Sequence, residues 1–418
     1  MLMSEQKDKG LLPVLRFPQF RDRGGWEEKK LGELDDVRDG THDSPKFFRE
    51  GKPLVTSKNL LEDGSLDLNN VNLICKEDYE QINKRSKVDV GDVLFGMIGT
   101  IGNPVMVRSD GFAIKNVALI KQKTELLNSY LVQLLRSQHI AEKLSVINSG
   151  NSQKFVALGQ LRNLSIPTPR IPEQQKIADC LTSVDELITV QTQKLDALKT
   201  HKKGLMQQLF PAEGETTPKL RFPEFRDKGE WSVKLLGKVA DNLDFKRIPI
   251  TEADRVKGAF PYYGASGVID YVEGYIFDEE LLCISEDGAN LVTRTYPIAF
   301  TISGKTWVNN HVHVLKFEHR FTQIIVENYL NAINLEDFLT GMAQPKLNQA
   351  KLEIIPIPLP DNGKEQQRIA DCLTSIDDLI AAQTQKLDIL KTHKKGLMQQ
   401  LFPAIDDDCM DTKAGVSA

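Results

Sequence analysis

The chain has 418 residues, of which 40% are hydrophobic and 27% are charged, and its formal net charge is −5. This length suits two or three globular cores, and no apolar run approaches the roughly 20 residues that cross a bilayer. The first residues, MLMSEQKDKG, lack the apolar centre of a secretory signal, so a cytoplasmic location is expected. The acidic balance argues mildly against nucleic-acid binding, although net charge is a poor guide to one local face.

In chain order, the first predicted element is a lead-in segment at 15–22 (LRFPQFRD), followed by Trp26 and Leu31-Gly32. Apolar patterns then predict short strands at 53–56, 71–75, 92–98 and 113–120 and an amphipathic helix at 125–146. A proline-rich hinge at 166–169 follows. Proline disfavours a helix interior, so the hinge predicts a boundary before the next element.

The next element is a long helix at 173–212, and the whole order of elements then returns. A second lead-in segment at 220–227 (LRFPEFRD) matches the first at a shift of 205, as do Trp231 and Leu236-Gly237. Strands are predicted at 275–285, 292–301 and 306–317, a helix at 322–339 and a hinge at 355–358. The two globular parts resemble each other only faintly, so the chain reads as two half-molecules with diverged centres.

The long helix is the strongest repeat, because 173–212 reappears as 365–404 at a shift of 192 with 34 of 40 positions identical. Apolar residues alternate in steps of three and four, the heptad pattern of a coiled coil. A helix of roughly 55 Å cannot leave such a stripe in water, and its near-copy is the obvious antiparallel partner. Gln191 and Lys202, with their counterparts Gln383 and Lys394, interrupt the stripe. They either fix the register or contact another protein.

A search for catalytic motifs finds no enzyme signature. Residues 299–306 fit a relaxed phosphate-loop pattern, but the alternating residues after them predict a strand where a phosphate loop needs a helix. His311 and His313 alternate with valines and have no cysteine or carboxylate at ligand spacing, so no metal site is expected. The five cysteines form no CxxC pair and are read as structural thiols.

Several polar loops have the chemistry of sequence readers. Asparagine and glutamine can pair with adenine, and lysine with guanine or phosphate, whereas the alternative for any single residue is a solvated loop. A loop after the amphipathic helix presents Gly, Gln and Lys in both halves, which favours a shared role. The candidate DNA-binding residues are Thr41, His42, Lys46, Lys58, Asn59, Gln153, Lys154, Tyr262, Tyr263, Ser266, Lys305, Trp307, Asn310, Gln344 and Lys346.

The chain resembles the specificity subunit of type I restriction–modification enzymes over nearly its whole length. The resemblance rests on the lead-in segments LRFPQF and LRFPEF, each with its Trp and Leu-Gly, and on the DGTHDSP, YYGASG and EDGA loops. It also rests on the proline hinge before EQQ-IAD-L and on the GLMQQLFP helix ends. Each motif is weak alone, but the set is highly specific.

The resemblance implies an α/β (α+β-like) fold of two target-recognition domains, joined by two long antiparallel coiled-coil helices with pseudo-two-fold symmetry. The expected parts are 1–172 (target-recognition domain 1), 173–212 (central conserved helix), 213–364 (target-recognition domain 2), 365–404 (C-terminal conserved helix) and 405–418 (an acidic tail, expected to be disordered). Each domain would read one half of a split DNA site in inverted orientation, and the helices would set the spacer.

The resemblance further implies a non-catalytic chain that binds no cofactor itself. Two modification subunits would bind S-adenosylmethionine and methylate adenine, and restriction subunits would use ATP and Mg²⁺ to translocate and cleave DNA. Two other interpretations stay open from the residues alone. One is a coiled-coil scaffold protein without nucleic-acid binding, and the other is an autonomous enzyme such as a phosphate-loop ATPase.

Overall fold

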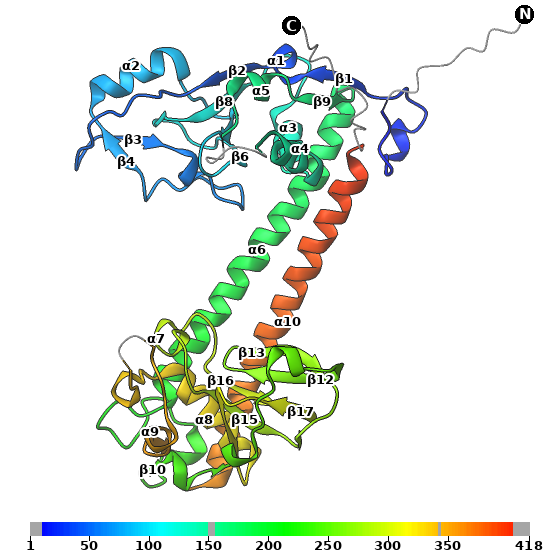
Figure 1. Cartoon of the computed structure of the whole chain (residues 1–418). Helices are drawn as coiled ribbons and strands as arrows, with labels where there is room; N and C mark the ends of the chain where they lie inside the picture. Colours follow the sequence, from blue (N-terminus) through cyan, green and yellow to red (C-terminus); the bar gives the residue numbers. More distant parts are fainter. Residues whose placement is uncertain (1–10, 149–154, 342–343, 404–418) are drawn as a thin grey trace, which may run out of the picture. The chain divides into compact units, whose positions relative to one another are not determined.

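The computed structural model describes residues 11–148, 155–341 and 344–403, except the side chains of 145–148. The chain divides into two compact units, the first made of Met1–Val190 and Leu387–Ala418 and the second of Gln191–Lys386. Each long helix, α6 (Ile171–Leu209) and α10 (Gly363–Leu401), therefore gives one half to each unit (Figure 1).

The first unit contains a four-stranded antiparallel sheet in the order β2-β8-β5-β6 and a three-stranded sheet in the order β4-β3-β7. A further pair, β1-β9, joins the residues after the lead-in segment to the proline hinge. The strands are β1 (Glu27–Lys30), β2 (Asp36–Asp39), β3 (Lys52–Val55), β4 (Asn72–Ile74), β5 (Val93–Gly96), β6 (Gly102–Met106), β7 (Ala113–Ile114), β8 (Val117–Lys121) and β9 (Ser165–Thr168). The helices are α1 (Leu31–Leu34), α2 (Lys76–Ser86), α3 (Asn128–Leu135), α4 (Gln138–Asn148) and α5 (Leu158–Arg162).

The second unit repeats this arrangement with one added strand, β14. Its sheets have the orders β11-β18-β15-β16 and β13-β12-β17-β14, and β10 pairs with β19. The strands are β10 (Ser232–Leu235), β11 (Asp241–Asn242), β12 (Lys257–Gly264), β13 (Gly267–Val272), β14 (Phe277–Asp278), β15 (Leu281–Ser285), β16 (Ala299–Ile302), β17 (Lys305–Val308), β18 (Val312–Lys316) and β19 (Pro356–Leu359). The helices are α7 (Asn290–Thr293), α8 (Arg320–Ala332) and α9 (Gln349–Glu353).

The strand registers define which positions of the two units correspond. Asp36 of β2 pairs with Lys121 of β8, and Asp241 of β11 pairs with Lys316 of β18. The parallel pairs β3-β7 and β12-β17 also correspond. The same topology therefore carries two different sequences, and a residue of one unit can be compared with its counterpart in the other.

The main core of each unit joins the sheet to the ends of the long helices. In the first unit, Tyr130 of α3 makes edge contacts with Trp26 and Phe402, with ring centroids 6.4 and 5.7 Å apart. In the second unit, Phe210 makes the corresponding edge contact with Trp231, with centroids 6.1 Å apart. The Trp after each lead-in segment and the Phe after each helix are thus core residues.

The two long helices run antiparallel within each unit. In the first unit, Leu181 of α6 shares a core with Leu401 of α10, and further along α6 Asp185 meets Lys394, 2.6 Å apart. In the second unit, Lys202 meets Asp377 at 2.6 Å, and α6 beyond it packs near Leu373. As the residue numbers of the contacts increase along α6, the residue numbers of their partners on α10 decrease. These contacts confirm the predicted mixed fold with antiparallel long helices.

A buried ion pair fastens each lead-in segment to the start of a long helix. The Arg16 guanidinium donates to Glu173 at 2.7 and 2.8 Å and to the carbonyls of Arg23 and Gly24. Arg221 makes the same set of bonds to Glu365, at 2.7 and 2.8 Å, and to the carbonyls of Lys228 and Gly229.

Each lead-in segment also bonds to the far end of a long helix. The Leu15 amide donates to the Gln400 carbonyl of α10 at 2.8 Å, and the Leu220 amide donates to the Gln208 carbonyl of α6 at 2.8 Å. The first lead-in segment therefore bonds to α10, the helix that lies last in the sequence. The second bonds to α6, the helix that immediately precedes it.

Some predicted elements differ in the structure. The helix expected at 125–146 is two helices, α3 and α4, because the chain turns at Arg136, whose guanidinium bonds the Pro104 carbonyl at 3.0 Å. The strand expected at 292–301 is wrong at its start, where α7 ends in the left-handed Arg294 and Asn290 closes the turn against Tyr296. Residues 299–306 form β16, a turn and the start of β17, with no helix after them. No helix among the described residues is long and apolar enough to cross a membrane.

Candidate nucleic-acid interface

In the first unit, a polar cluster forms where β2 ends at Asp39. The Asp39 carboxylate accepts from His42 Nε2 at 2.9 Å and pairs with the Arg85 guanidinium of α2. The other nitrogen of His42, Nδ1, lies 2.8 Å from the Asn116 side-chain oxygen. The hydrogen bond to Asp39, followed by the one to Asn116, raises the pKa of His42. The side chain of His42 is 56% exposed, so an ionisable group faces solvent beside the loops at this end of the sheet.

The backbone holds this cluster through the loop before β8. Asn116 adopts a left-handed conformation with φ 54°, its amide donates to the Thr41 carbonyl, and the Thr41 amide donates to the Ile114 carbonyl. The Lys115 ammonium donates to the Ser44 hydroxyl at 2.6 Å. The loops at 40–46 and 115–116 are therefore one tied structure with polar side chains at its surface.

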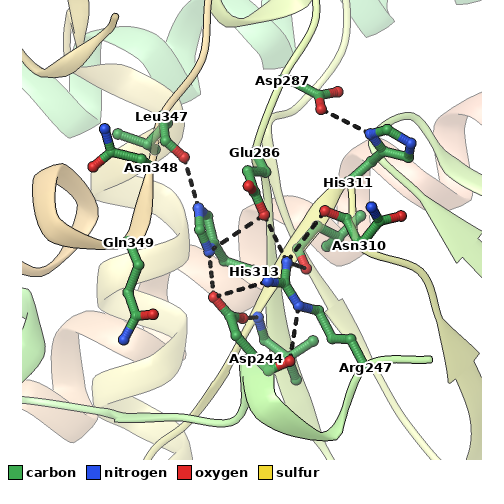
Figure 2. Close-up of polar contacts among 12 residues, drawn as sticks. Asp244, Arg247, Glu286, Asp287, Asn310, His311, His313, Leu347, Asn348 and Gln349 are labelled. Atoms are coloured by element: carbon green, nitrogen blue, oxygen red, sulfur yellow. Dashed lines mark hydrogen bonds and ion pairs between the residues drawn. The ribbon is translucent and has the colours of Figure 1, made fainter. Parts of the chain in front are cut away.

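The second unit builds a larger and more buried cluster at the corresponding place. Asp244 corresponds to Asp39, and Arg247 occupies the position of His42. Arg247 donates to the Glu286 carboxylate at 2.7 Å and to the Val312 carbonyl at 2.8 Å (Figure 2). Its Nη2 lies 3.5 Å from Asp244. Arg247 is largely buried, so it organises the loops rather than facing solvent.

His313 of β18 is the centre of this second cluster and is 1% exposed. Its Nδ1 lies 2.6 Å from Asp244 Oδ2, and its Nε2 lies 2.7 Å from the Leu347 carbonyl (Figure 2). Nδ1 is also 3.9 Å from Glu286. The histidine thus links Asp244, which follows β11, to the backbone of Leu347.

Both carboxylates of the cluster are charged. Burial alone would raise the pKa of Asp244, but the hydrogen bond and charge of His313, with the Val314 amide and Arg247, lower it overall. Burial likewise opposes ionisation of Glu286, and the hydrogen bond from Arg247, the charge of His313 and the bond from Lys346 lower its pKa overall. The cluster therefore holds two carboxylates against three basic groups.

A more exposed polar layer lies next to this network. His311 Nδ1 lies 2.7 Å from Asp287 Oδ2, and the His311 amide donates to the Asn309 side chain at 2.8 Å. The neighbouring Asn310 is exposed, and its carbonyl accepts from Arg247 at 3.4 Å. Lys346 pairs with Glu286 at 3.1 Å, and half of its side chain stays exposed. Such donors and acceptors fit hydrogen-bond readout of base edges or phosphates.

The structure distributes the predicted DNA-binding residues over several environments. Lys46, Lys58, Ser266, Lys305, Asn310, Gln344 and Lys346 are exposed, as is His42, while Thr41, Tyr263 and Trp307 are half-buried. Trp307 donates to the Ile248 carbonyl at 2.7 Å, Tyr263 stacks on Phe300, and Lys305 lies 4.8 Å from the centre of the Tyr275 ring. Gln153 and Lys154 lie outside the described residues.

Two predicted contact residues lie in the core instead of at the surface. Asn59 is buried, because its side chain accepts from the Thr56 amide at 2.9 Å and donates to the Asn70 carbonyl at 3.0 Å. Tyr262 is 1% exposed, and its hydroxyl bonds the backbone of Ile250. In this conformation neither side chain is accessible to DNA, and both hold loops in place.

The four polar residues predicted in the helix stripe all make contacts between α6 and α10. Gln383 donates to the Gln191 side chain at 2.8 Å, and Lys202 and Lys394 pair with the carboxylates of Asp377 and Asp185. The Lys202–Asp377 and Lys394–Asp185 pairs correspond at the shift of 192 seen in the sequence. Whether partner chains also use these residues stays a prediction.

The sequence did not single out Asp244 or Arg247, and it marked Asp39 and Glu286 only as part of the DGTHDSP and EDGA motifs. A signal was present, because the shift of 205 that aligns the lead-in segments also aligns Asp39 with Asp244 and His42 with Arg247. His313 was noted only as a weak metal candidate. Within the described residues, no group of three or more His, Cys, Asp or Glu side chains could hold a metal ion.

The comparison with protein families matches both halves of the chain. The model described as "Type I restriction modification DNA specificity domain" matches residues 23–200 and 228–392. The "Type I restriction enzyme MjaVIII specificity subunit" of Methanocaldococcus jannaschii is 25% identical over 426 residues, which cover 93% of each chain. A Haemophilus influenzae chain that bears the name of a type I restriction enzyme specificity subunit is 39% identical over 149 residues, 35% of this chain and 38% of its own length.

Solved structures agree in fold. The type I restriction–modification S subunit from M. genitalium has a TM-score of 0.65 at 14% identity, and the match covers 95% of this chain and 100% of that one. A chain from a study of complex assembly and conformational transition of the type I system has a TM-score of 0.51 at 18% identity, with coverage of 91% and 98%. At these identities the likeness establishes the fold alone.

Proposed function

Because the chain belongs to the type I restriction–modification DNA specificity family, we propose that it selects a bipartite DNA site and that each globular unit reads one half. The family match confirms the resemblance drawn from the sequence. The chain is a DNA-recognition subunit, and it is not itself the enzyme. The two half-sites are proposed to be different and to be read in inverted orientation, so the whole site is asymmetric.

The observation that best supports two different half-sites is the equivalent polar cluster in each unit. Asp39 ends β2 and the corresponding Asp244 lies shortly after β11, but His42 in the first unit corresponds to Arg247 in the second. Ala118 of β8 likewise corresponds to His313 of β18. One scaffold with different hydrogen-bonding side chains suits recognition of two unlike base sequences.

The long helices are proposed to set the spacer between the half-sites and to dock two adenine methyltransferase subunits. Through these, ATP-dependent restriction subunits would join the complex. S-adenosylmethionine, ATP and Mg²⁺ are assigned to these partners. The near-identical sequences of α6 and α10 support two equivalent docking surfaces, and their shared ion pairs support a fixed register.

The proposal is tested by mapping methylated adenines in cells that carry this gene and the gene of its methyltransferase. The expected result is one asymmetric split motif, methylated on both strands. Replacing residues 1–172 with those of another family member should change one half of the motif and leave the other half and the spacer unchanged. A motif that changes in both halves, or a continuous motif, would contradict the proposal that each unit reads one half-site.

A further inference from the structure

The described segment Gln344–Leu347, here called the Lys346 segment, is fixed to the end of β15 by backbone bonds. The Leu347 amide donates to the Glu286 carbonyl at 2.8 Å, and the Gly288 amide donates to the Pro345 carbonyl at 3.1 Å. Lys346 exchanges two bonds of 2.8 Å with Thr340. The segment thus presents the exposed Gln344 and Lys346 from a defined base.

His313 adds a side-chain bond to this segment. The Leu347 carbonyl can only accept, so His313 Nε2 donates to it at 2.7 Å. The other ring nitrogen, Nδ1, lies 2.6 Å from Asp244 Oδ2. The ring is therefore held by Asp244 on one side and holds the segment on the other.

Groups on several elements surround the His313 ring. Asp244 and Glu286 face it as carboxylates, while Arg247 and Lys346 are the neighbouring cations. Asp244 is itself fixed, because it accepts from the Val314 amide at 2.8 Å and from the Asn242 side chain at 3.2 Å. Without the imidazole, the buried Leu347 carbonyl would lose this donor.

We infer that His313 is a positioning residue for DNA readout by the second unit: its imidazole holds the Lys346 segment in place, and recognition of that half-site weakens when the imidazole is removed. This inference rests on the proposed function. It adds that the second reader depends on a buried histidine that the first unit does not have at the corresponding position.

The first unit provides an internal contrast. Ala118 takes the place of His313, and Met97 takes the place of Glu286. The backbone contact is kept there, since the Val156 amide donates to the Met97 carbonyl at 2.9 Å. An alanine at position 118 cannot supply the side-chain bond that His313 makes in the second unit.

The test uses the full chain in complex with its methyltransferase. Methylation kcat/KM is measured on duplexes with one base changed in either half-site. For His313→Leu, discrimination at the second half-site is expected to fall about tenfold or more relative to the wild type, and discrimination at the first half-site should stay unchanged. His319→Leu, at an exposed histidine before α8, is the matched control and should keep the wild-type discrimination at both half-sites.

A second measurement does not depend on DNA. Amide hydrogen exchange at Lys346 and Leu347 should be faster in His313→Leu than in the wild type, because the segment has lost the imidazole bond. Asp244→Asn, which changes the contact that orients the ring, is the second variant if His313→Leu does not fold, and it should act in the same direction. Exchange that is unaffected by these variants would overturn the role of His313 in holding the segment.

The outcomes separate the inference from the proposed function. If exchange changes as expected but second-half discrimination stays within twofold of wild type, His313 holds the segment without serving readout, and the inference is wrong. If neither half-site shows any discrimination in the wild-type complex, the proposed function fails. The exchange result then still shows whether His313 holds the Lys346 segment.

Discussion

Asp35 of the first unit shows how one buried charge can oppose stability. It follows α1, where one oxygen accepts from the Lys123 amide at 3.0 Å and the other has no partner among the described residues. Burial raises the pKa of Asp35 to about 6, and the Lys123 backbone bond only partly offsets this. The corresponding residue of the second unit is Ala240, so the fold does not need a carboxylate there.

We expect Asp35→Asn to stabilise the chain at pH 8 by up to about 3 kcal/mol, since one pKa unit corresponds to about 1.4 kcal/mol. A raised pKa in the folded state means that the wild type loses relative stability as the pH rises from about 4 through 6. The variant cannot ionise, so its advantage should appear over the same range and vanish near pH 4. Urea unfolding at pH 4 and pH 8 measures this, with the exposed Asp110→Asn as control. A gain in stability of equal size at pH 4 and pH 8 would show that ionisation of Asp35 is not its cause.

At the scale of elements, the Arg16–Glu173 pair joins a lead-in segment to α6. Arg16→Met should lower the free energy of unfolding by about 3–5 kcal/mol, because Glu173 then stays buried without its partner. Adding Glu173→Leu should restore part of that loss, since no uncompensated charge is left. Lys29→Met, which removes the exposed Lys29–Glu125 pair, is the control and should cost less than about 1 kcal/mol. A double variant no more stable than Arg16→Met would contradict this explanation.

The long helices expose leucines at corresponding positions, Leu187 of α6 (51% exposed) and Leu379 of α10 (57%). If the methyltransferase docks on the helices, Leu187→Glu with Leu379→Glu should weaken its binding at least tenfold without lowering the unfolding midpoint. Val233→Glu makes the same change at an exposed site on β10 and should leave binding unaltered. Calorimetric titration with the methyltransferase measures both. Unchanged affinity of the double variant would show that the methyltransferase does not dock at these leucines.

The sequence predicted the long helices and the two-part order well because their signals are local or repeated. Heptad spacing and the shift of 192 placed α6 and α10, whereas the proline hinges, which were predicted only as boundaries, overlap the strands β9 and β19. The sites were harder, because burial depends on contacts distant in the sequence. Tyr262 looked like a surface aromatic but fills a core, and His313 is read correctly only once Asp244 and Leu347 are known to face it.

For the whole molecule, we expect the length of the two long helices to set the length of the spacer between the half-sites. Seven residues inserted after Val190 in α6 and after Ala382 in α10 preserve the heptad and lengthen both helices by about 10 Å. The methylated motif should then gain about three base pairs of spacer with both halves unchanged, since base pairs are spaced by about 3.4 Å. The same insertion in α6 alone should disrupt helix pairing and lower methylation. An unaltered spacer in the double insertion would rule out the helices as its determinant.

The bonds of the two lead-in segments have a consequence for connectivity. Leu15 bonds Gln400 as Leu220 bonds Gln208, so each lead-in segment has an equivalent partner near the end of a long helix. A permuted chain from Gly214 to Pro403, joined through Ala-Glu-Gly-Glu to Leu11 and ending at Glu213, should fold and direct the methyltransferase to the same motif. Circular dichroism and methylome mapping would check it, and a permutant that folds but recognises a different motif would show that the location of the chain ends matters after all.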